Sequence, residues 1–348
     1  MQENKSMPSI STQPGLSRTA VLAGLVVVAI VAVGALLVGV DSLSRQLISG
    51  RKASDKKAGS GLGKEFDYDL KAYRKTDPKL IVYKEEAPVP TGFTINRGLA
   101  VDRKDRIYVA GDEAIRVFDK DGRQSAEIGP INARCLAVAD DGTLYVGVRY
   151  NVAVLGVDGT VKATWECLGA SALITSLAVG EKDVFIADAG NRIVMHYDRS
   201  GKRLGKIGRK DAAKNVPGFV LPSPYFDLAI APDGLLRVVN PGHHRIEAYT
   251  FDGDLETSWG VPSTTIEGFC GCCNPTHLAV LPDGGFVTSE KGLPRVKVYD
   301  SQGKFQCVVA GCESFTDDTI LAGVAVDSKG RVLVLDPVKK SVRVFVKK

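Results

Sequence analysis

Six copies of one short pattern follow residue 80 and restrict the fold more than any other feature of the chain. Each copy begins with a triplet in which Ala lies between two larger aliphatic residues. The triplets are Leu99-Ala100-Val101, Leu136-Ala137-Val138, Leu177-Ala178-Val179, Leu228-Ala229-Ile230, Leu278-Ala279-Val280 and Val324-Ala325-Val326. Their starts are 37 to 51 residues apart, a period typical of propeller blades. One such unit cannot bury its apolar face alone, so neighbouring copies must stack.

The first copy shows the order of elements within one repeat. Residues 97–129 are RGLAVDRKDRIYVAGDEAIRVFDKDGRQSAEIG, in which short apolar segments alternate with turns rich in Asp and Gly. Four short strands joined by tight turns form one antiparallel sheet, which is a blade. The 37 glycines of the chain also favour a turn-rich, all-β body. We therefore predict an all-β fold with a six-bladed β-propeller over residues 80–348.

These landmarks resemble the NHL-repeat family. The best match is residues 177–208, LAVGEKDVFIADAGNRIVMHYDRSGKRLGKIG, which contains the A-V, A-D, G-N-R-I and D-x-x-G positions typical of that repeat. The resemblance covers residues 80–348, and the GCCNP motif is similar to that of uncharacterised bacterial members. It implies a six-bladed NHL propeller. It implies no single activity, because the family includes binding scaffolds, sensor ectodomains and a few enzymes.

The last copy predicts how the ring closes. Its third strand, residues 341–346, is followed by only two residues, so its blade needs an outer strand from elsewhere. Residues 80–84, LIVYK, have strand character and precede the first copy. We expect this segment to complete the last blade.

An uncharged apolar segment precedes the propeller. Residues 19–40 would form a helix about 33 Å long, enough to cross a hydrocarbon core of about 30 Å. The segment is longer than the apolar core of a cleaved signal peptide, and no small-x-small cleavage site follows it. We predict a short tail (1–18), an uncleaved transmembrane helix (19–40) that contacts bilayer lipid, and a flexible stalk (41–79) before the propeller.

Two features disagree about which side of the membrane the propeller occupies. Basic residues after the helix, such as Arg51 and Lys52, would keep it in the cytoplasm by the positive-inside rule. Long domains, however, translocate largely regardless of charge, and seven cysteines favour an oxidising compartment. We predict a single-pass protein of the bacterial inner membrane with its propeller in the periplasm or outside the cell.

The long insertions between copies predict the working face. Residues 209–223, 261–275 and 312–322 are crossovers between blades, and propeller connectivity places them on one face, here called the top face. Long loops on a rigid scaffold are where binding usually resides, so we expect a protein, peptide or polymer partner there. The net charge of +5 is spread along the chain without a basic stripe interleaved with aromatic residues. No nucleic-acid partner is therefore expected.

The cysteines divide into two groups by blade. They are Cys135, Cys167, Cys270, Cys272, Cys273, Cys307 and Cys312. The first two belong to the second blade and its exit, and the other five surround the fifth blade, nearly opposite on the ring. A disulfide requires Cα atoms about 4.4–6.8 Å apart, so only local bridges are expected. These are Cys135–Cys167, and one or two from Cys270, Cys272 or Cys273 to Cys307 or Cys312.

The segment FCGCCNP, residues 269–275, leaves three interpretations open. Its cysteines form structural disulfides, or they hold a metal ion or an iron–sulfur cluster, or they include a redox-active or nucleophilic thiol. The C-x-C-C spacing differs from the C-x₂-C spacing that zinc sites favour.

The residue before each triplet is expected to enter the top of the central channel. These residues are Gly98, Cys135, Ser176, Asp227, His277 and Gly323. Asp227 and His277 are candidate ligands of a zinc, copper or calcium ion, with Ser176 and Cys135 beside them. NHL-type amidating lyases are similar in placing metal-binding histidines along their channel, although only His277 fits that pattern. The alternative is a set of ordinary polar residues lining a wet channel.

Three functions follow from these observations. A membrane-tethered binding or scaffold module is favoured by the predicted anchor, stalk and long top loops, and by the lack of a defensible catalytic constellation. A metal-dependent lyase or hydrolase would use Asp227 and His277. A redox or electron-transfer subunit would hold its metal at the fifth-blade cysteines.

Overall fold

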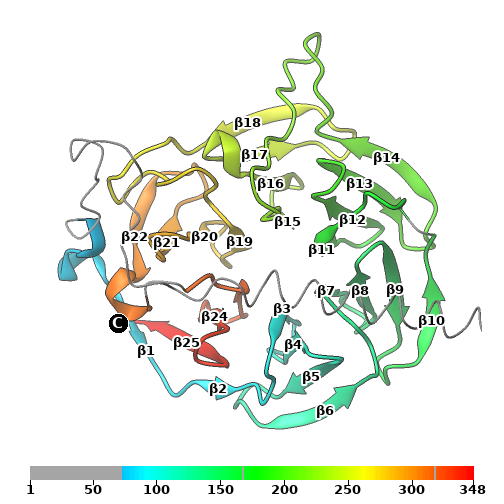
Figure 1. Ribbon diagram of the computed structural model, residues 1–348, viewed down its shortest axis with the longest axis horizontal. Helices are drawn as coiled ribbons and strands as arrows, with labels where there is room; N and C mark the ends of the chain where they lie inside the picture. The colour runs from blue at the N-terminus through cyan, green and yellow to red at the C-terminus, as the bar shows by residue number, and fades with distance from the viewer. Residues whose placement is uncertain (1–72, 167, 317–318) are drawn as a thin grey trace, which may run out of the picture. The chain divides into compact units, whose positions relative to one another are not determined.

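A ring of six sheets forms the body of the protein. The computed structural model describes residues 73–166, 168–316 and 319–348, which belong to one compact unit, Asp69–Lys348. Within these residues six antiparallel sheets surround a central axis (Figure 1). The predicted six-bladed β-propeller is confirmed.

Five blades have four strands each in sequence order from the axis outward. The first contains β3 (Asn96–Val101), β4 (Ile107–Gly111), β5 (Ala114–Phe118) and β6 (Gln124–Ile128); the second contains β7 (Cys135–Val138), β8 (Leu144–Val148), β9 (Asn151–Leu155) and β10 (Val161–Thr164). The third contains β11 (Ile174–Val179), β12 (Asp183–Asp188), β13 (Ile193–Asp198) and β14 (Arg203–Ile207); the fourth contains β15 (Leu228–Ile230), β16 (Leu236–Asn240), β17 (Arg245–Tyr249) and β18 (Leu255–Trp259). The fifth contains β19 (His277–Val280), β20 (Phe286–Ser289), β21 (Val296–Tyr299) and β22 (Phe305–Ala310).

Three short 3₁₀ helices among the described residues are η3 (Pro78–Leu80), η4 (Pro241–His243) and η5 (Cys312–Ser314).

The sixth blade closes the ring. Its strands β23 (Gly323–Val326), β24 (Val332–Asp336) and β25 (Ser341–Lys347) are completed by β1 (Tyr83–Glu85) and β2 (Val89–Pro90) from the N-terminal side. Tyr83 pairs with Lys347, and Val89 pairs with Val342. The predicted closure is therefore confirmed, but the strand lies slightly later than residues 80–84 and continues the pairing through β2.

The hydrophobic core is divided among the junctions between blades. Tyr108 of the first blade and Leu136 of the second share one cluster, and similar clusters occupy each of the other five junctions. The cluster between the sixth and first blades joins Leu333 to Val109, so it seals the ring. Because each sheet buries both faces against its neighbours, the small Ala of each inner triplet allows the strands to approach near the axis.

The N-terminal predictions lie outside the part that the structure describes. These are the tail, the transmembrane helix of residues 19–40 and most of the stalk. No helix within the described residues has the length and apolar character that a membrane span requires.

Candidate binding sites on the top face

The structure brings together all six residues predicted at the channel mouth. Gly98, Cys135, Ser176, Asp227, His277 and Gly323 line one cavity of about 250 Å³ along the axis. Each lies in or just before the first strand of its blade, so the six positions converge at the axis. The alignment of the six copies was sufficient to identify this set.

Hydrogen bonds at the channel mouth link four consecutive blades. Asp227 Oδ1 accepts from Ser176 Oγ of the third blade, and its Oδ2 accepts from the Leu278 amide of the fifth at 2.9 Å. His277 Nδ1 lies 3.4 Å from Asp227 Oδ2. His277 Nε2 donates to the Leu321 carbonyl, 3.0 Å away, in the crossover to the sixth blade. These contacts hold the inner strands around the axis.

This bonding leaves little capacity for a metal ion. Both oxygens of Asp227 already accept hydrogen bonds, and Nε2 of His277 donates to a carbonyl oxygen, so this nitrogen has no lone pair for a metal ion. Within the described residues no group of three His, Cys, Asp or Glu side chains is placed to share an ion. The geometry fits the alternative that Asp227 and His277 are structural polar residues of the channel.

A second cavity of about 350 Å³ lies at the mouth, with His277 in the walls of both. Its wall includes Arg97, Arg134 and Tyr225. Asn96 also lines it, is 7% exposed, and has no hydrogen-bond partner for either side-chain amide atom. A buried polar group without a protein partner is costly, and both amide atoms are closed to solvent.

The described cysteines form no disulfide with one another. The six described cysteines, Cys135, Cys270, Cys272, Cys273, Cys307 and Cys312, are free, and Cys167 lies outside the described residues. Cys307 lies in the hydrophobic core between the fifth and sixth blades. The buried guanidinium of Arg295 is close to both Cys270 and Cys312. The expected bridges from the loop to Cys307 or Cys312 are therefore wrong, because other side chains surround each sulfur.

Burial makes three of these thiols poor nucleophiles. It raises the pKa of Cys135 to about 12, with a smaller effect from the Asp227 charge. It raises the pKa of Cys312 to about 11 and also raises that of Cys307. Since the thiolate is the reactive form, these cysteines behave as small hydrophobic residues.

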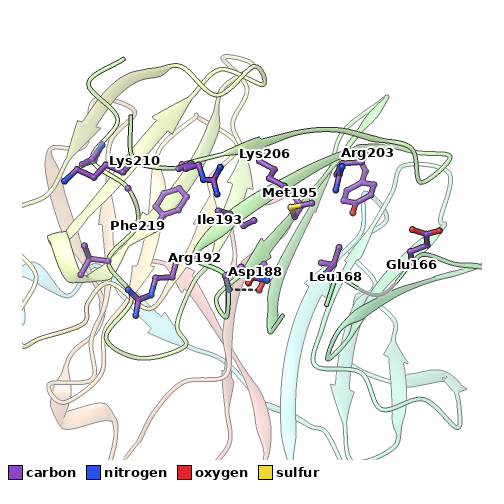
Figure 2. Close-up of a pocket in the computed structure, with 17 residues that line it drawn as sticks. Glu166, Leu168, Asp188, Arg192, Ile193, Met195, Arg203, Lys206, Lys210 and Phe219 are labelled. Carbon is purple, nitrogen blue, oxygen red and sulfur yellow. Dashed lines mark hydrogen bonds between the residues drawn. The ribbon is translucent and has the colours of Figure 1, made fainter. Parts of the chain in front are cut away.

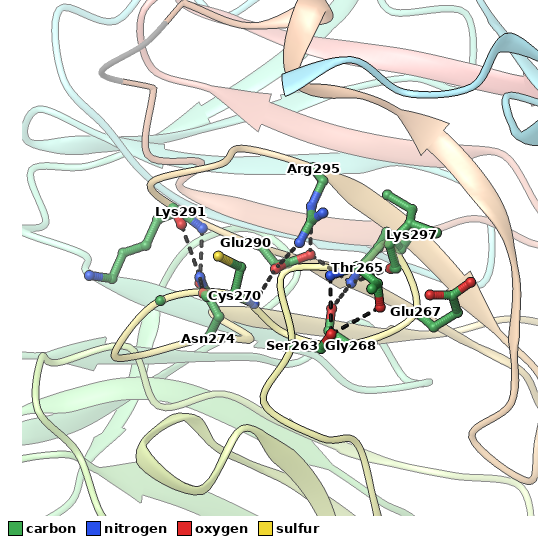
Figure 3. Close-up of polar contacts among 12 residues, drawn as sticks. Ser263, Thr265, Glu267, Gly268, Cys270, Asn274, Glu290, Lys291, Arg295 and Lys297 are labelled. Atoms are coloured by element: carbon green, nitrogen blue, oxygen red, sulfur yellow. Dashed lines mark hydrogen bonds and ion pairs between the residues drawn. The ribbon is translucent and has the colours of Figure 1, made fainter. Parts of the chain in front are cut away.

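A buried charge cluster supports the FCGCCNP loop (Figure 3). The carboxylate of Glu290 contacts Arg295 Nη2 at 2.8 Å and Lys297 Nζ at 2.7 Å, and all three side chains are almost inaccessible. Glu290 Oε2 also accepts from the Cys270 amide at 3.1 Å, and Lys297 Nζ donates to the Gly268 carbonyl at 2.6 Å. The cluster therefore attaches the crossover to the fifth blade.

Basic side chains gather around a groove on the third blade (Figure 2). The groove has a volume of about 600 Å³ and is lined by five cationic and two acidic side chains: Arg192, Arg203, Lys206, Arg209 and Lys210, with Glu166 and Asp188. In the view of Figure 2, Arg192, Lys210 and Phe219 lie at one end, and Arg203 and Glu166 lie at the other. Ile193, Met195 and Phe219 supply an apolar lining.

The five cations of the groove are exposed, and none has an ion-pair or side-chain hydrogen-bond partner among the described residues. Asp188 keeps its negative charge but is buried, and its oxygens accept from the Leu173 amide at 3.0 Å and from Asn191. The five cations therefore face two acidic groups, an excess of three positive charges. The groove attracts anionic groups.

Sequence reasoning missed both charged clusters. Lys297 and Arg295 interrupt an apolar strand pattern, LPRVKVY, which could have indicated buried charges. The segment KRLGKIGRK, residues 202–210, contains five cations, but the rest of the groove comes from Glu166, Leu168 and residues within 188–197 and 217–220. Only the folded blade and its crossovers bring these segments together.

The sequence matches no family model and no curated protein. The fold is similar to a virginiamycin B lyase from Staphylococcus aureus (TM-score 0.55, 12% identity, 76% of this chain and 100% of that chain). It is also similar to a protein of unknown function from Bacteroides thetaiotaomicron (0.57, 15%, 76% and 72%) and to the WD40 β-propeller domain of Doa1 (0.51, 16%, 73% and 79%). At these identities the likeness shows the β-propeller fold alone. Membership of the NHL-repeat family stays a prediction, as does the relation of the GCCNP motif to that of its bacterial members.

Proposed function

We propose that this chain is a membrane-tethered binding module whose propeller binds an acidic segment of a partner protein on its top face. The observation that carries the proposal is the third-blade groove, where five exposed cations surround an apolar lining and have no partner in the part of the chain that the structure describes. A propeller fold suits a binding or scaffold module. In an extended peptide that alternates acidic and apolar residues, the acidic side chains would pair with the cations of the groove. The apolar side chains would pack against its apolar lining.

The groove favours a peptide over a nucleic acid. Single-stranded nucleic acids bind through exposed aromatic faces combined with basic side chains. Tyr197 and Phe219, the aromatic residues of the groove, are 9% and 5% exposed, and Tyr197 is already stacked on Trp165. No ring face is therefore free for a base.

A binding assay with a charge-reversed control tests this proposal. Fluorescence anisotropy would measure the affinity of the full-length chain for a short labelled peptide in which Glu alternates with Val. We expect the triple variant Arg203→Gln, Lys206→Gln, Lys210→Gln to bind roughly tenfold more weakly, because each exposed charge pair contributes about 0.2–1 kcal/mol. Added salt should weaken binding of the unaltered chain.

The matched control removes three exposed lysines away from the groove, Lys104, Lys329 and Lys339, which should leave both affinity and melting temperature unchanged. Equal loss in the two triple variants would show that net charge alone drives binding. Tighter binding of a single-stranded DNA or of the corresponding Lys-Val peptide would overturn the proposal.

The tether rests on residues 19–40, an uncharged segment long enough to span a bilayer. We expect the full chain to sediment with membranes after alkaline carbonate washing and a chain without residues 1–40 to stay in the supernatant. Protection of the propeller from protease in spheroplasts would argue against the periplasmic placement that we propose. A full chain that remains in the supernatant would overturn the tether itself.

A further inference from the structure

Two adjacent thiols lie in the crossover that precedes the fifth blade. The Sγ atoms of Cys272 and Cys273 are 3.1 Å apart; the first residue is exposed, and the second is 3% exposed. Lys291 contacts Cys273 and places its Nζ 5.3 Å from the ring of Tyr225, a wall of the upper cavity. The pair therefore combines a buried sulfur next to a cation with a sulfur that solvent reaches.

The pKa values of the two thiols are shifted in opposite directions. Burial opposes the Cys273 thiolate, but hydrogen bonds that include those from Lys291 and Cys272 outweigh it and lower the pKa of Cys273. The hydrogen bond to Cys273 raises the pKa of Cys272. The contact between the two sulfurs therefore favours the thiolate on Cys273 and the proton on Cys272.

The backbone around the pair is held in place by Asn274, which is 2% exposed. Its Oδ1 accepts from the Lys291 amide, and its Nδ2 donates to the Lys291 carbonyl, both at 2.9 Å. The same Nδ2 donates to the Cys270 carbonyl, and the Cys270 amide is bound by Glu290 (Figure 3). One network thus fixes the sulfurs and the lysine relative to each other, as a reactive site requires.

We propose that Cys272 and Cys273 form a reversible two-electron redox couple that reduces a disulfide substrate and becomes a vicinal disulfide. Cα atoms of adjacent residues are about 3.8 Å apart, less than the ~4.4–6.8 Å of relaxed disulfides. A bridge between them is strained and is therefore easily reduced again. A strained disulfide of this kind is suited to thiol–disulfide exchange and not to stabilising the fold.

The reaction balances without another cofactor. Cys272 passes its proton to Cys273 across the 3.1 Å contact and attacks one sulfur of the substrate, whose other sulfur leaves as a thiolate. Cys273 then releases that proton to solvent and attacks Cys272 Sγ, and the second substrate sulfur leaves as a thiolate. The substrate disulfide gains the two electrons that the dithiol loses.

Peptide mass spectrometry on the full-length chain tests the couple. The reduced protein would be equilibrated with glutathione and glutathione disulfide at several ratios, quenched with acid, alkylated with N-ethylmaleimide and digested. In the oxidised protein we expect the peptide that carries Cys270, Cys272 and Cys273 to have lost two hydrogens and to carry one label, on Cys270. Labels on all three cysteines at every ratio, or a bridge that includes Cys270, would overturn the proposal.

Two further pairs of variants separate the roles of the cysteines and of Lys291. Cys273→Ser should trap one glutathione on Cys272, whereas Cys270→Ser should oxidise as the unaltered chain does. Lys291→Gln should move the alkylation of the pair to higher pH, and Lys304→Gln, an exposed lysine of the same blade, should not. Identical alkylation profiles for the two lysine variants would remove Lys291 from the site. Failure of the peptide-binding assay leaves this couple untouched, since the two sites share no residue.

Discussion

The fifth-blade charge cluster and the third-blade groove are both built around basic side chains, but they are satisfied in opposite ways. In the interior Glu290 pairs with both Arg295 and Lys297, and the cluster holds a loop. The five cations of the groove face solvent and have no partner among the described residues. Charges that are paired within the chain maintain structure, whereas unpaired charges beside a cavity are available to a ligand.

Removing Glu290, the anion that Arg295 and Lys297 share, should have the largest effect and tests whether the buried cluster stabilises the fold. Glu290→Ala should lower the free energy of unfolding by about 3–5 kcal/mol, because it removes the carboxylate that two buried cations share. Chemical denaturation would measure the change. Glu181→Ala, at an exposed acid of the third blade, is the control and should change stability by less than about 0.5 kcal/mol. Similar small losses in both would mean that the cluster is not a stabilising unit.

The pH dependence of stability tests the same cluster in a second way. Burial lowers the pKa of Lys297 from 10.5 to about 8, against the opposing effect of Glu290. Below pH 8 both folded and unfolded chains carry the proton, so the cost of burying the charge is fully present. Between pH 8 and 10.5 the folded chain releases the proton while the unfolded chain keeps it, so stability rises with pH. The gain should reach at most about 3 kcal/mol relative to Lys297→Met. Parallel profiles for the two proteins would contradict this assignment.

The channel mouth is an intermediate case, since its polar groups are paired but partly exposed. Asp227→Ala should cost about 1–3 kcal/mol, because it removes the acceptor for the Ser176 hydroxyl and the Leu278 amide. Peptide affinity at the groove should not change. A thermal melt and the anisotropy assay would check both. Lost peptide binding in a stably folded Asp227→Ala protein would place the ligand at the channel and break the comparison.

The outcome for the cysteines shows where sequence reasoning reached its limit. The alignment of copies correctly grouped Cys135 with the channel mouth and the FCGCCNP cysteines with a top crossover. It could not identify bonding partners, because these depend on side-chain direction. Cys307 lies in an inter-blade core, and the buried Arg295 is close to both Cys270 and Cys312.

The sequence by itself determined the ring. Six apolar triplets at blade spacing require six stacked sheets, and the segment before the first copy supplies the strand that the last blade needs. The residues at the channel mouth followed from the same repeat, because equivalent positions meet at the axis. Only the tertiary structure decided which charges are paired, since Glu290 reaches Lys297 across a strand turn while the groove collects cations from several segments. The sequence repeat determines the backbone of the blades. The crossovers between blades do not repeat, and they bring together the side chains of the proposed binding groove.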